Sequence, residues 1–199
     1  MIKSQYGEGL DDRIHRIFPF LFVRPIDPNL LSVTGVLVSF AGAWAWAEGQ
    51  FRLGAFIVLL GGFFDLVDGV VARHNHSSSL FGAFLDSTLD RVVDGALLLA
   101  LVMFYARQDA FGIAWLAGVA LVATQLVSYT KARAESVVPD FKGGILERAE
   151  RVVILVAGAV FGLMPLAIGV VAAGSTWTAG QRILIARRRM AELPTPENA

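Results

Sequence analysis

Six apolar stretches, each close to the length of a membrane-spanning helix, occupy most of this 199-residue chain. A spanning helix needs roughly 20 mainly apolar residues, and short polar breaks separate the stretches. We expect helices over residues 29–49, 51–73, 82–106, 110–134, 146–164 and 166–188. With 55% hydrophobic and 17% charged residues, the composition is not that of a soluble domain. The sequence therefore predicts an all-α integral membrane protein with six transmembrane helices.

The helices leave room for one domain only, which we expect over residues 29–189, with a cytoplasmic tail over 190–199. Residues 1–28 contain a segment, 11–20, in which charged and apolar residues alternate irregularly. That mixture is typical of an amphipathic helix lying at the membrane interface. A disordered basic leader is the alternative for residues 1–28.

Basic residues are distributed unevenly between the two sides of the predicted bundle. If residue 1 starts in the cytoplasm, fourteen Lys and Arg residues fall on the cytoplasmic side, against Arg52 and Arg107 outside. Cytoplasmic loops of membrane proteins carry such an excess of Lys and Arg. We therefore expect a multi-pass protein of the cytoplasmic (inner) membrane with both termini in the cytoplasm. The formal net charge of zero indicates no particular partner, and we expect no nucleic acid to bind.

Four aspartates interrupt the second and third apolar stretches. Asp65 and Asp68 are three residues apart, and Asp86 and Asp90 are four apart. These spacings put each pair on one face of a helix, so the two pairs can converge. Carboxylates at membrane depth are costly and usually functional, and hard divalent cations prefer oxygen ligands. The sequence therefore predicts a site for one or two cations, with its mouth on the cytoplasmic side.

Residues 65–90 read D-x2-D-G-x2-A-R-x8-G-x3-D-x3-D. This pattern resembles the diagnostic motif of the CDP-alcohol phosphotransferase family. The resemblance implies two Mg²⁺ or Mn²⁺ ions held by Asp65, Asp68 and Asp86, with Asp90 as general base and further metal ligand. It also implies a homodimer.

The small residues of the motif allow a nucleotide to approach the helix backbones closely, and Arg73 can donate to phosphate as a fork. Upstream, Pro28-Asn29-x-x-Ser32 is similar to a segment that helps to bind CDP in this family, although Asn29 or Ser32 can equally cap a helix. The predicted CDP-binding residues are Asn29, Ser32, Asp65, Asp68, Gly69, Ala72, Arg73 and Gly82.

Basic residues also gather at the cytoplasmic ends of the later helices. Lys131 follows Ser128 by one helical turn, and Arg148 and Arg151 are three residues apart. Taken singly, each cation can be a topological anchor, whereas a basic pocket beside a metal centre suits an acceptor that carries a phosphate. Which of Arg148 and Arg151 faces that pocket stays open.

The strings S-Y-x-K-A-R-A-E from Ser128 and G-G-x-x-E-R-x-E-R from Gly143 look like those of phosphatidylinositol phosphate synthases, one branch of the family. This resemblance implies transfer of the phosphatidyl group of CDP-diacylglycerol to inositol 1-phosphate. It also implies that the acceptor's phosphate is bound by Ser128, Lys131, Arg148, Arg151 and Arg182. Asp94, four residues after Asp90, and Arg91 are expected to pair with each other or to support the metal ligands.

Other functions compete with this one. A phosphatidylglycerophosphate synthase would use glycerol 3-phosphate as its phosphorylated acceptor, and an archaeal-type enzyme would use an ether-lipid donor. A cation transporter would need a polar path to the outer side, whereas the outer halves of the predicted helices are apolar. The transporter hypothesis is therefore the weakest of the three.

Overall fold

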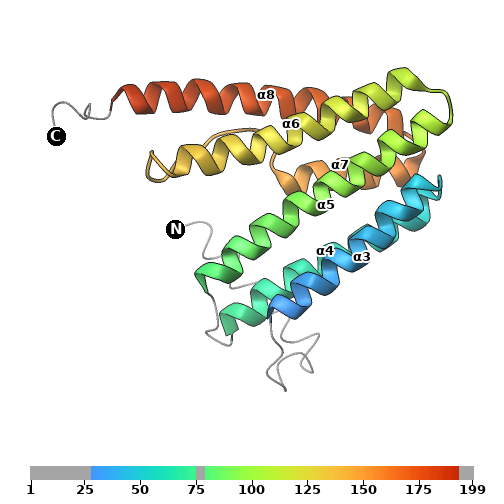
Figure 1. Cartoon of the computed structure of the whole chain (residues 1–199), viewed down its shortest axis with the longest axis horizontal. Helices are drawn as coiled ribbons and strands as arrows, with labels where there is room; N and C mark the ends of the chain where they lie inside the picture. The colour runs from blue at the N-terminus through green and yellow to red at the C-terminus, as the bar shows by residue number, and fades with distance from the viewer. Residues whose placement is uncertain (1–27, 75–78, 193–199) are drawn as a thin grey trace.

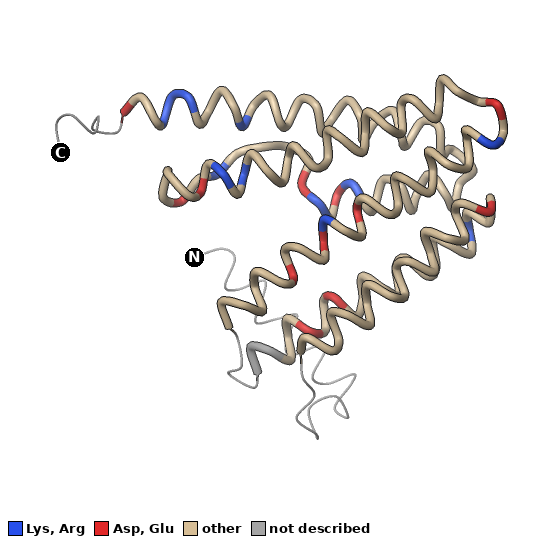
Figure 2. The backbone as a smooth tube through the Cα atoms, viewed as in Figure 1, with Lys and Arg blue, Asp and Glu red and all other residues tan. Residues whose placement is uncertain are grey.

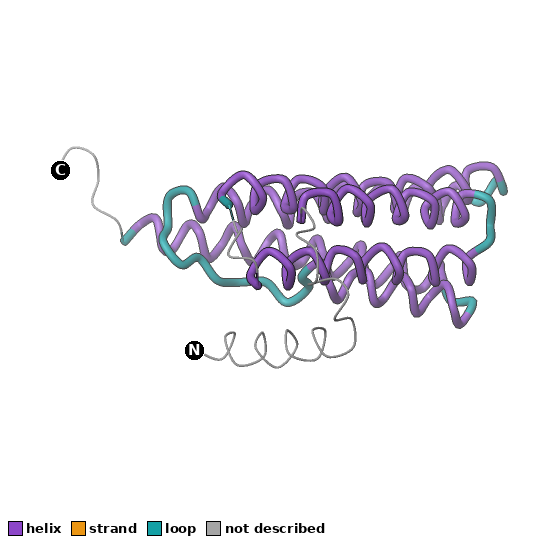
Figure 3. Tube along the Cα trace, turned by 90° about the horizontal axis from the view of Figure 1, so that it is seen from below, coloured by secondary structure: helices purple, strands orange, loops and turns teal. Residues whose placement is uncertain are grey.

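The structure, a computed structural model, describes residues 28–74 and 79–192, without the side chains of residues 72–74. Its elements are α3 (Pro28–Ala47), α4 (Phe51–His74), α5 (Leu80–Arg107), α6 (Phe111–Glu135), α7 (Arg148–Phe161) and α8 (Met164–Ala191). Within the described ranges there is no strand (Figure 3). The prediction of an all-α fold is therefore confirmed for this part of the chain. The predicted interfacial helix and most of the predicted tail lie outside the described residues.

The helices run up and down as an antiparallel bundle (Figure 1). Contacts at one end join three connections. Arg107 donates to the carbonyl of Ala47 and lies 3.4 Å from Glu48, which ties the α5 end to the α3–α4 connection. Nε of Arg52 donates to the carbonyl of Val160 at 3.3 Å, which adds the end of α7. The long loop between α6 and α7 therefore lies at the opposite end.

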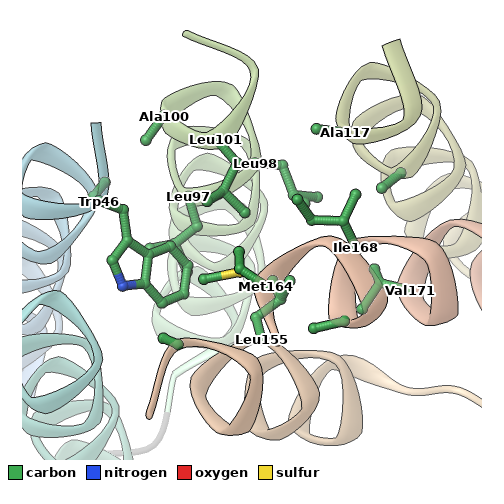
Figure 4. Close-up of a cluster of buried hydrophobic side chains, with 14 of the residues drawn as sticks. Trp46, Leu97, Leu98, Ala100, Leu101, Ala117, Leu155, Met164, Ile168 and Val171 are labelled. Carbon is green, nitrogen blue, oxygen red and sulfur yellow. The ribbon is translucent and has the colours of Figure 1, made fainter. Parts of the chain in front are cut away.

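A shared apolar core joins the helices of the bundle. Helix α3 packs against α4 and α5, α6 packs against α5 and α8, and α7 packs against α4 and α8. Trp46, Leu97, Leu101, Met164 and Ile168, from three different helices, are almost completely buried in this core (Figure 4). The core fixes how α5 and α7 lie relative to α4.

Glycines let α3 and α4 approach each other closely. A Cβ atom on Gly61 would overlap Oγ of Ser39 and would lie 2.9 Å from the carbonyl oxygen of Gly35. A Cβ atom on Gly62 would meet nothing within 4 Å. Small residues at such crossings allow the close van der Waals packing on which helix association in membranes depends. This packing sets the distance between the start of α3 and the aspartates of α4.

Three helices of the described part are long and apolar enough to cross a membrane, over residues 28–47, 51–71 and 111–135. Helix α7 is shorter than the stretch expected over residues 146–164. Its 14 residues would span about 21 Å at 1.5 Å per residue. It ends at Gly162, whose φ of 73° is left-handed, and Pro165 follows in the first turn of α8. Within the described residues the number of helices agrees with the prediction, but only these three meet both the length and the apolar character of a membrane span.

Candidate functional site

Three of the four motif aspartates form one cluster. Asp65 and Asp68 lie on α4 and Asp86 lies on α5, and one carboxylate oxygen from each falls within 4.8 Å of the others. Carboxylate oxygens at this separation are a donor set suited to a hard divalent cation such as Mg²⁺ or Mn²⁺. The predicted convergence of these three residues is confirmed, and their chemistry fits a metal ion.

Residues at the starts of α3 and α5 support this cluster. Asp68 is buried, and the hydroxyl of Ser32 donates to its Oδ2. At the start of α5, Oγ of Ser79 accepts a hydrogen bond from the backbone N–H of Gly82 at 2.9 Å. A Cβ atom on Gly82 would lie 3.7 Å from Oδ1 of Asn29. Three of the predicted CDP-binding residues, Asn29, Ser32 and Gly82, therefore lie near one another and near the cluster.

The remaining predicted CDP-binding residues lie on α4. Gly69 follows Asp68 directly, and Ala72 and Arg73 come in the next turn of the same helix. The side chains of Ala72 and Arg73 are outside the described part of the structure.

Asp90 shares an arginine partner with Asp65. Nη1 of Arg148, at the start of α7, lies 2.8 Å from Oδ1 of Asp90 and 2.9 Å from Oδ2 of Asp65. The Arg148 and Asp90 side chains are 29% and 24% exposed, so both remain accessible. A single guanidinium nitrogen therefore links the cluster of Asp65, Asp68 and Asp86 to the last aspartate of the motif.

Next to Asp90 lies a polar cavity of about 170 Å³. We call it the acceptor pocket. Its lining includes all five residues predicted to bind the acceptor's phosphate, namely Ser128, Lys131, Arg148, Arg151 and Arg182. It also includes Asp90, Arg91, Asp94, Val127 and Glu147. The five cations outnumber the three carboxylates, so the pocket suits an anion. Figure 2 shows charged residues of α5 and α7 meeting in the interior of the bundle.

Arg182 is held by main-chain oxygens at the edge of the pocket. It is buried, with Nε donating to the carbonyl of Gly143 at 2.8 Å and Nη1 donating to that of Val127 at 2.5 Å. Gly144 has a φ of +107°, and a Cβ atom there would lie 2.6 Å from Cγ2 of Thr178 and 2.9 Å from Nε of Arg182. Only glycine fits this position, because both the backbone conformation and the close approach exclude a side chain. Gly144 thus lets the α6–α7 loop cross over Arg182.

Two neighbouring charges have partners that the sequence did not reveal. Arg91 donates to the carbonyl and hydroxyl oxygens of Ser87 on its own helix, and no contact with Asp94 is found. Asp94 instead contacts Arg151 at 2.9 Å and Arg148 at 3.6 Å. The four-residue spacing from Asp90 indicated that Asp94 lies near the site. Its partners are on a helix far along the chain, and no local pattern identifies them.

Comparison with known sequences gives the following similarities. Residues 26–181 match the sequence model of the CDP-alcohol phosphatidyltransferase family. A phosphatidylinositol phosphate synthase of Streptomyces avermitilis is 39% identical over 205 residues, which cover 95% of this chain and 84% of that protein. An archaetidylinositol phosphate synthase of Methanothermobacter thermautotrophicus is 38% identical over 181 residues, which cover 85% of this chain and 90% of that protein.

Solved structures of the Mycobacterium tuberculosis phosphatidylinositol phosphate synthase have a similar fold. The structure with CDP-DAG bound has a TM-score of 0.76 and 28% identity, covering 92% of this chain and 94% of that chain. The structure with manganese and citrate has a TM-score of 0.79 and 27% identity, covering 95% and 92%. From the family match and the extent of these similarities, we conclude that the chain belongs to the CDP-alcohol phosphatidyltransferase family.

Proposed function

We propose that this protein transfers the phosphatidyl group of CDP-diacylglycerol to inositol 1-phosphate, giving phosphatidylinositol phosphate and CMP. The observation that carries the proposal is the position of Arg148, which contacts Asp65 and Asp90 and also lines the acceptor pocket. A phosphate bound in this pocket would therefore be close to the motif aspartates. The relatives named above, which act in bacteria and in an archaeon, support an inositol phosphate acceptor.

We assign Asp65, Asp68 and Asp86 as ligands of two Mg²⁺ or Mn²⁺ ions, with Asp90 as a further ligand. Bound ions would supply Lewis-acid polarisation of the phosphoryl group and would offset the charge of the leaving CMP. The three carboxylates of the cluster and the manganese in a structure of a relative support this assignment.

The nucleotide half of the donor would lie against the starts of α3 and α5 and the middle of α4. Ser32 would orient Asp68 through its hydrogen bond, and Asn29 would lie beside the nucleotide. The absence of side-chain bulk at Gly69, Ala72 and Gly82 would leave room for it. Arg73 would donate to phosphate oxygens.

Asp90 would act as the general base. Its carboxylate accepts the proton of an inositol hydroxyl, and the resulting oxygen attacks the phosphorus that carries the diacylglycerol. The bond between this phosphorus and the bridging oxygen then breaks, and CMP leaves. Arg148 holds Asp90 in place, while Ser128, Lys131, Arg151 and Arg182 offer donors to the acceptor's phosphate.

All six helices of the domain over residues 29–189 would cross the inner membrane, with both termini and the site on the cytoplasmic side. The excess of Lys and Arg at that end supports this orientation. Helix α7 without its flanking loop is too short for a hydrocarbon core of roughly 30 Å. The segment of the α6–α7 loop that precedes α7 would span the remaining thickness. We also propose a homodimer, as the family resemblance implies.

The test is an assay of the purified protein in liposomes that contain CDP-diacylglycerol. CMP release would be measured with Mg²⁺ or Mn²⁺ and one acceptor at a time, either inositol 1-phosphate or glycerol 3-phosphate. A parallel assay with a CDP-activated diether lipid addresses the ether-lipid alternative. Asp90→Asn should abolish CMP release while CDP-diacylglycerol binding remains measurable. Normal turnover by that variant would exclude Asp90 as the base.

A further inference from the structure

We propose that Asp94 is a positioning residue that sets the affinity of the site for the acceptor's phosphate. The inference rests on the proposed function, because it concerns the acceptor of that reaction. Asp94 lies on α5 four residues after Asp90, outside the motif of residues 65–90. Its side chain is only 7% exposed, so it is less accessible to substrate than Asp90.

Asp94 contacts two arginines with its two carboxylate oxygens. Oδ2 accepts a hydrogen bond from Nη2 of Arg151 at 2.9 Å, and Oδ1 lies 3.6 Å from Nε of Arg148. Both arginines lie in the first turn of α7 and line the acceptor pocket. One buried carboxylate therefore contacts two of the cations that would bind phosphate.

Arg151 depends strongly on this contact. Its side chain is 4% exposed, and Asp94 is the one carboxylate found within ion-pair distance of it in the described part of the chain. Its other hydrogen bond, from Nη1 to the carbonyl of Leu146, is long at 3.3 Å, and Nε is buried without a partner. Arginine stays charged in proteins, so without Asp94 its guanidinium would lose both its counter-charge and its orientation.

Asp94 also contacts Arg148, the second of the two arginines that line the acceptor pocket. Nη1 of Arg148 bridges Asp65 and Asp90, while its Nε end faces Asp94. A planar guanidinium group held at both ends presents its remaining N–H donors in one direction, which favours binding of phosphate oxygens. Asp94 therefore fixes the geometry of two arginines and makes no direct contribution to the transfer step.

The test measures KM and kcat of Asp94→Asn separately for each substrate, in liposomes. We expect KM for inositol 1-phosphate to rise about tenfold, as when partners that orient a binding side chain are removed. The KM for CDP-diacylglycerol should stay within about twofold and kcat should change less than the acceptor KM, since the motif aspartates are intact. Asp94→Glu keeps the charge and should recover part of the acceptor affinity.

Thr124→Val is the matched control. Thr124 lines a small internal cavity together with Asp94 and Arg151, and it pairs with Ser175, but it does not line the acceptor pocket. This variant should lose some thermal stability with no change in the acceptor KM. If Asp94→Asn does not purify as a folded protein, Asp94→Glu carries the test and should still raise the acceptor KM over that of the wild type.

An unchanged acceptor KM with a lower kcat would show a merely structural role and would overturn the proposal. A lower acceptor KM would overturn it as well, because Asp94 would then only be opposing the phosphate's charge. Failure of the proposed function is recognised separately, since the wild-type protein would then not consume inositol 1-phosphate. In that case the same comparison is made with the phosphorylated acceptor that the wild type does use.

Discussion

Nη1 of Arg148, at the start of α7, lies 2.8 Å from Oδ1 of Asp90 on α5. This pair joins the acceptor pocket to Asp90, the last aspartate of the motif. An acceptor whose phosphate contacts Arg148 would thus have a hydroxyl within reach of Asp90. Binding of the acceptor and removal of its proton would then depend on one ion pair.

Arg148→Lys should reduce kcat/KM for inositol 1-phosphate by about 10- to 100-fold. Lysine keeps the charge, but its ammonium group cannot span two carboxylates and a phosphate as a planar fork does. Steady-state kinetics in liposomes would measure the effect. Arg188→Lys is the control, because Arg188 is exposed in the last turn of α8. Equal activity of both variants would contradict the role of Arg148.

Ser32→Ala should weaken metal binding, because the hydroxyl of Ser32 donates to Asp68, one of the three proposed metal ligands. We expect the half-saturating Mn²⁺ concentration to rise about tenfold, a usual effect of losing a partner that orients a ligand. Electron paramagnetic resonance of bound Mn²⁺ would follow it directly. Thr34→Ala, two residues away, removes a hydroxyl that donates to the carbonyl of Leu30 on its own helix. If both variants bind Mn²⁺ like the wild type, Ser32 does not support the metal site.

The sequence predicted the aspartate cluster because helical spacing determines which side chains share a face. Asp65, Asp68 and Asp86 meet as their spacings indicated. The spacing could not predict that Asp94 pairs with Arg151, 57 residues away, because that contact depends on how α5 and α7 are rotated against each other. Arg91 and Asp94 are three residues apart and are expected to pair or to support the metal ligands, yet Arg91 contacts Ser87 and Asp94 contacts Arg151.

Helix lengths followed local signals only in part. The stop at Gly162 and the restart near Pro165 are visible in the sequence. The start of α7 at Arg148 rather than at residue 146 is less so, because the backbone N–H of Leu146 donates to Oγ1 of Thr178 at 3.2 Å, in a non-helical conformation. That conformation depends on a residue of α8, which no pattern within the loop reveals.

Gly61→Ala should destabilise the protein by about 1–3 kcal/mol, the usual cost of overpacking a tight contact. The added methyl group would collide with Ser39 and Gly35 and would push α3 away from α4. Gly62→Ala is a closely matched control, because its added methyl group would meet nothing within 4 Å. Thermal unfolding in detergent should separate the two variants. Similar melting temperatures would mean that α3 and α4 do not pack as closely as described.

The proposed orientation can be tested by labelling, because the chain has no cysteine. Single cysteines would replace Gln108, in the α5–α6 connection, and Ser136, in the α6–α7 loop. In intact spheroplasts, a membrane-impermeant maleimide should label Gln108→Cys only, and opening the membrane should expose Ser136→Cys. Labelling in the reverse order would place the site on the outer face.

The identity of the lipid product tests the central claim most directly. Inositol 1-phosphate and glycerol 3-phosphate would be offered together at equal concentration with CDP-diacylglycerol and Mn²⁺, and the product headgroup would be determined by mass spectrometry. We predict phosphatidylinositol phosphate as the main product, formed in step with CMP. Phosphatidylglycerophosphate as the main product, or CMP release without either lipid, would contradict the account.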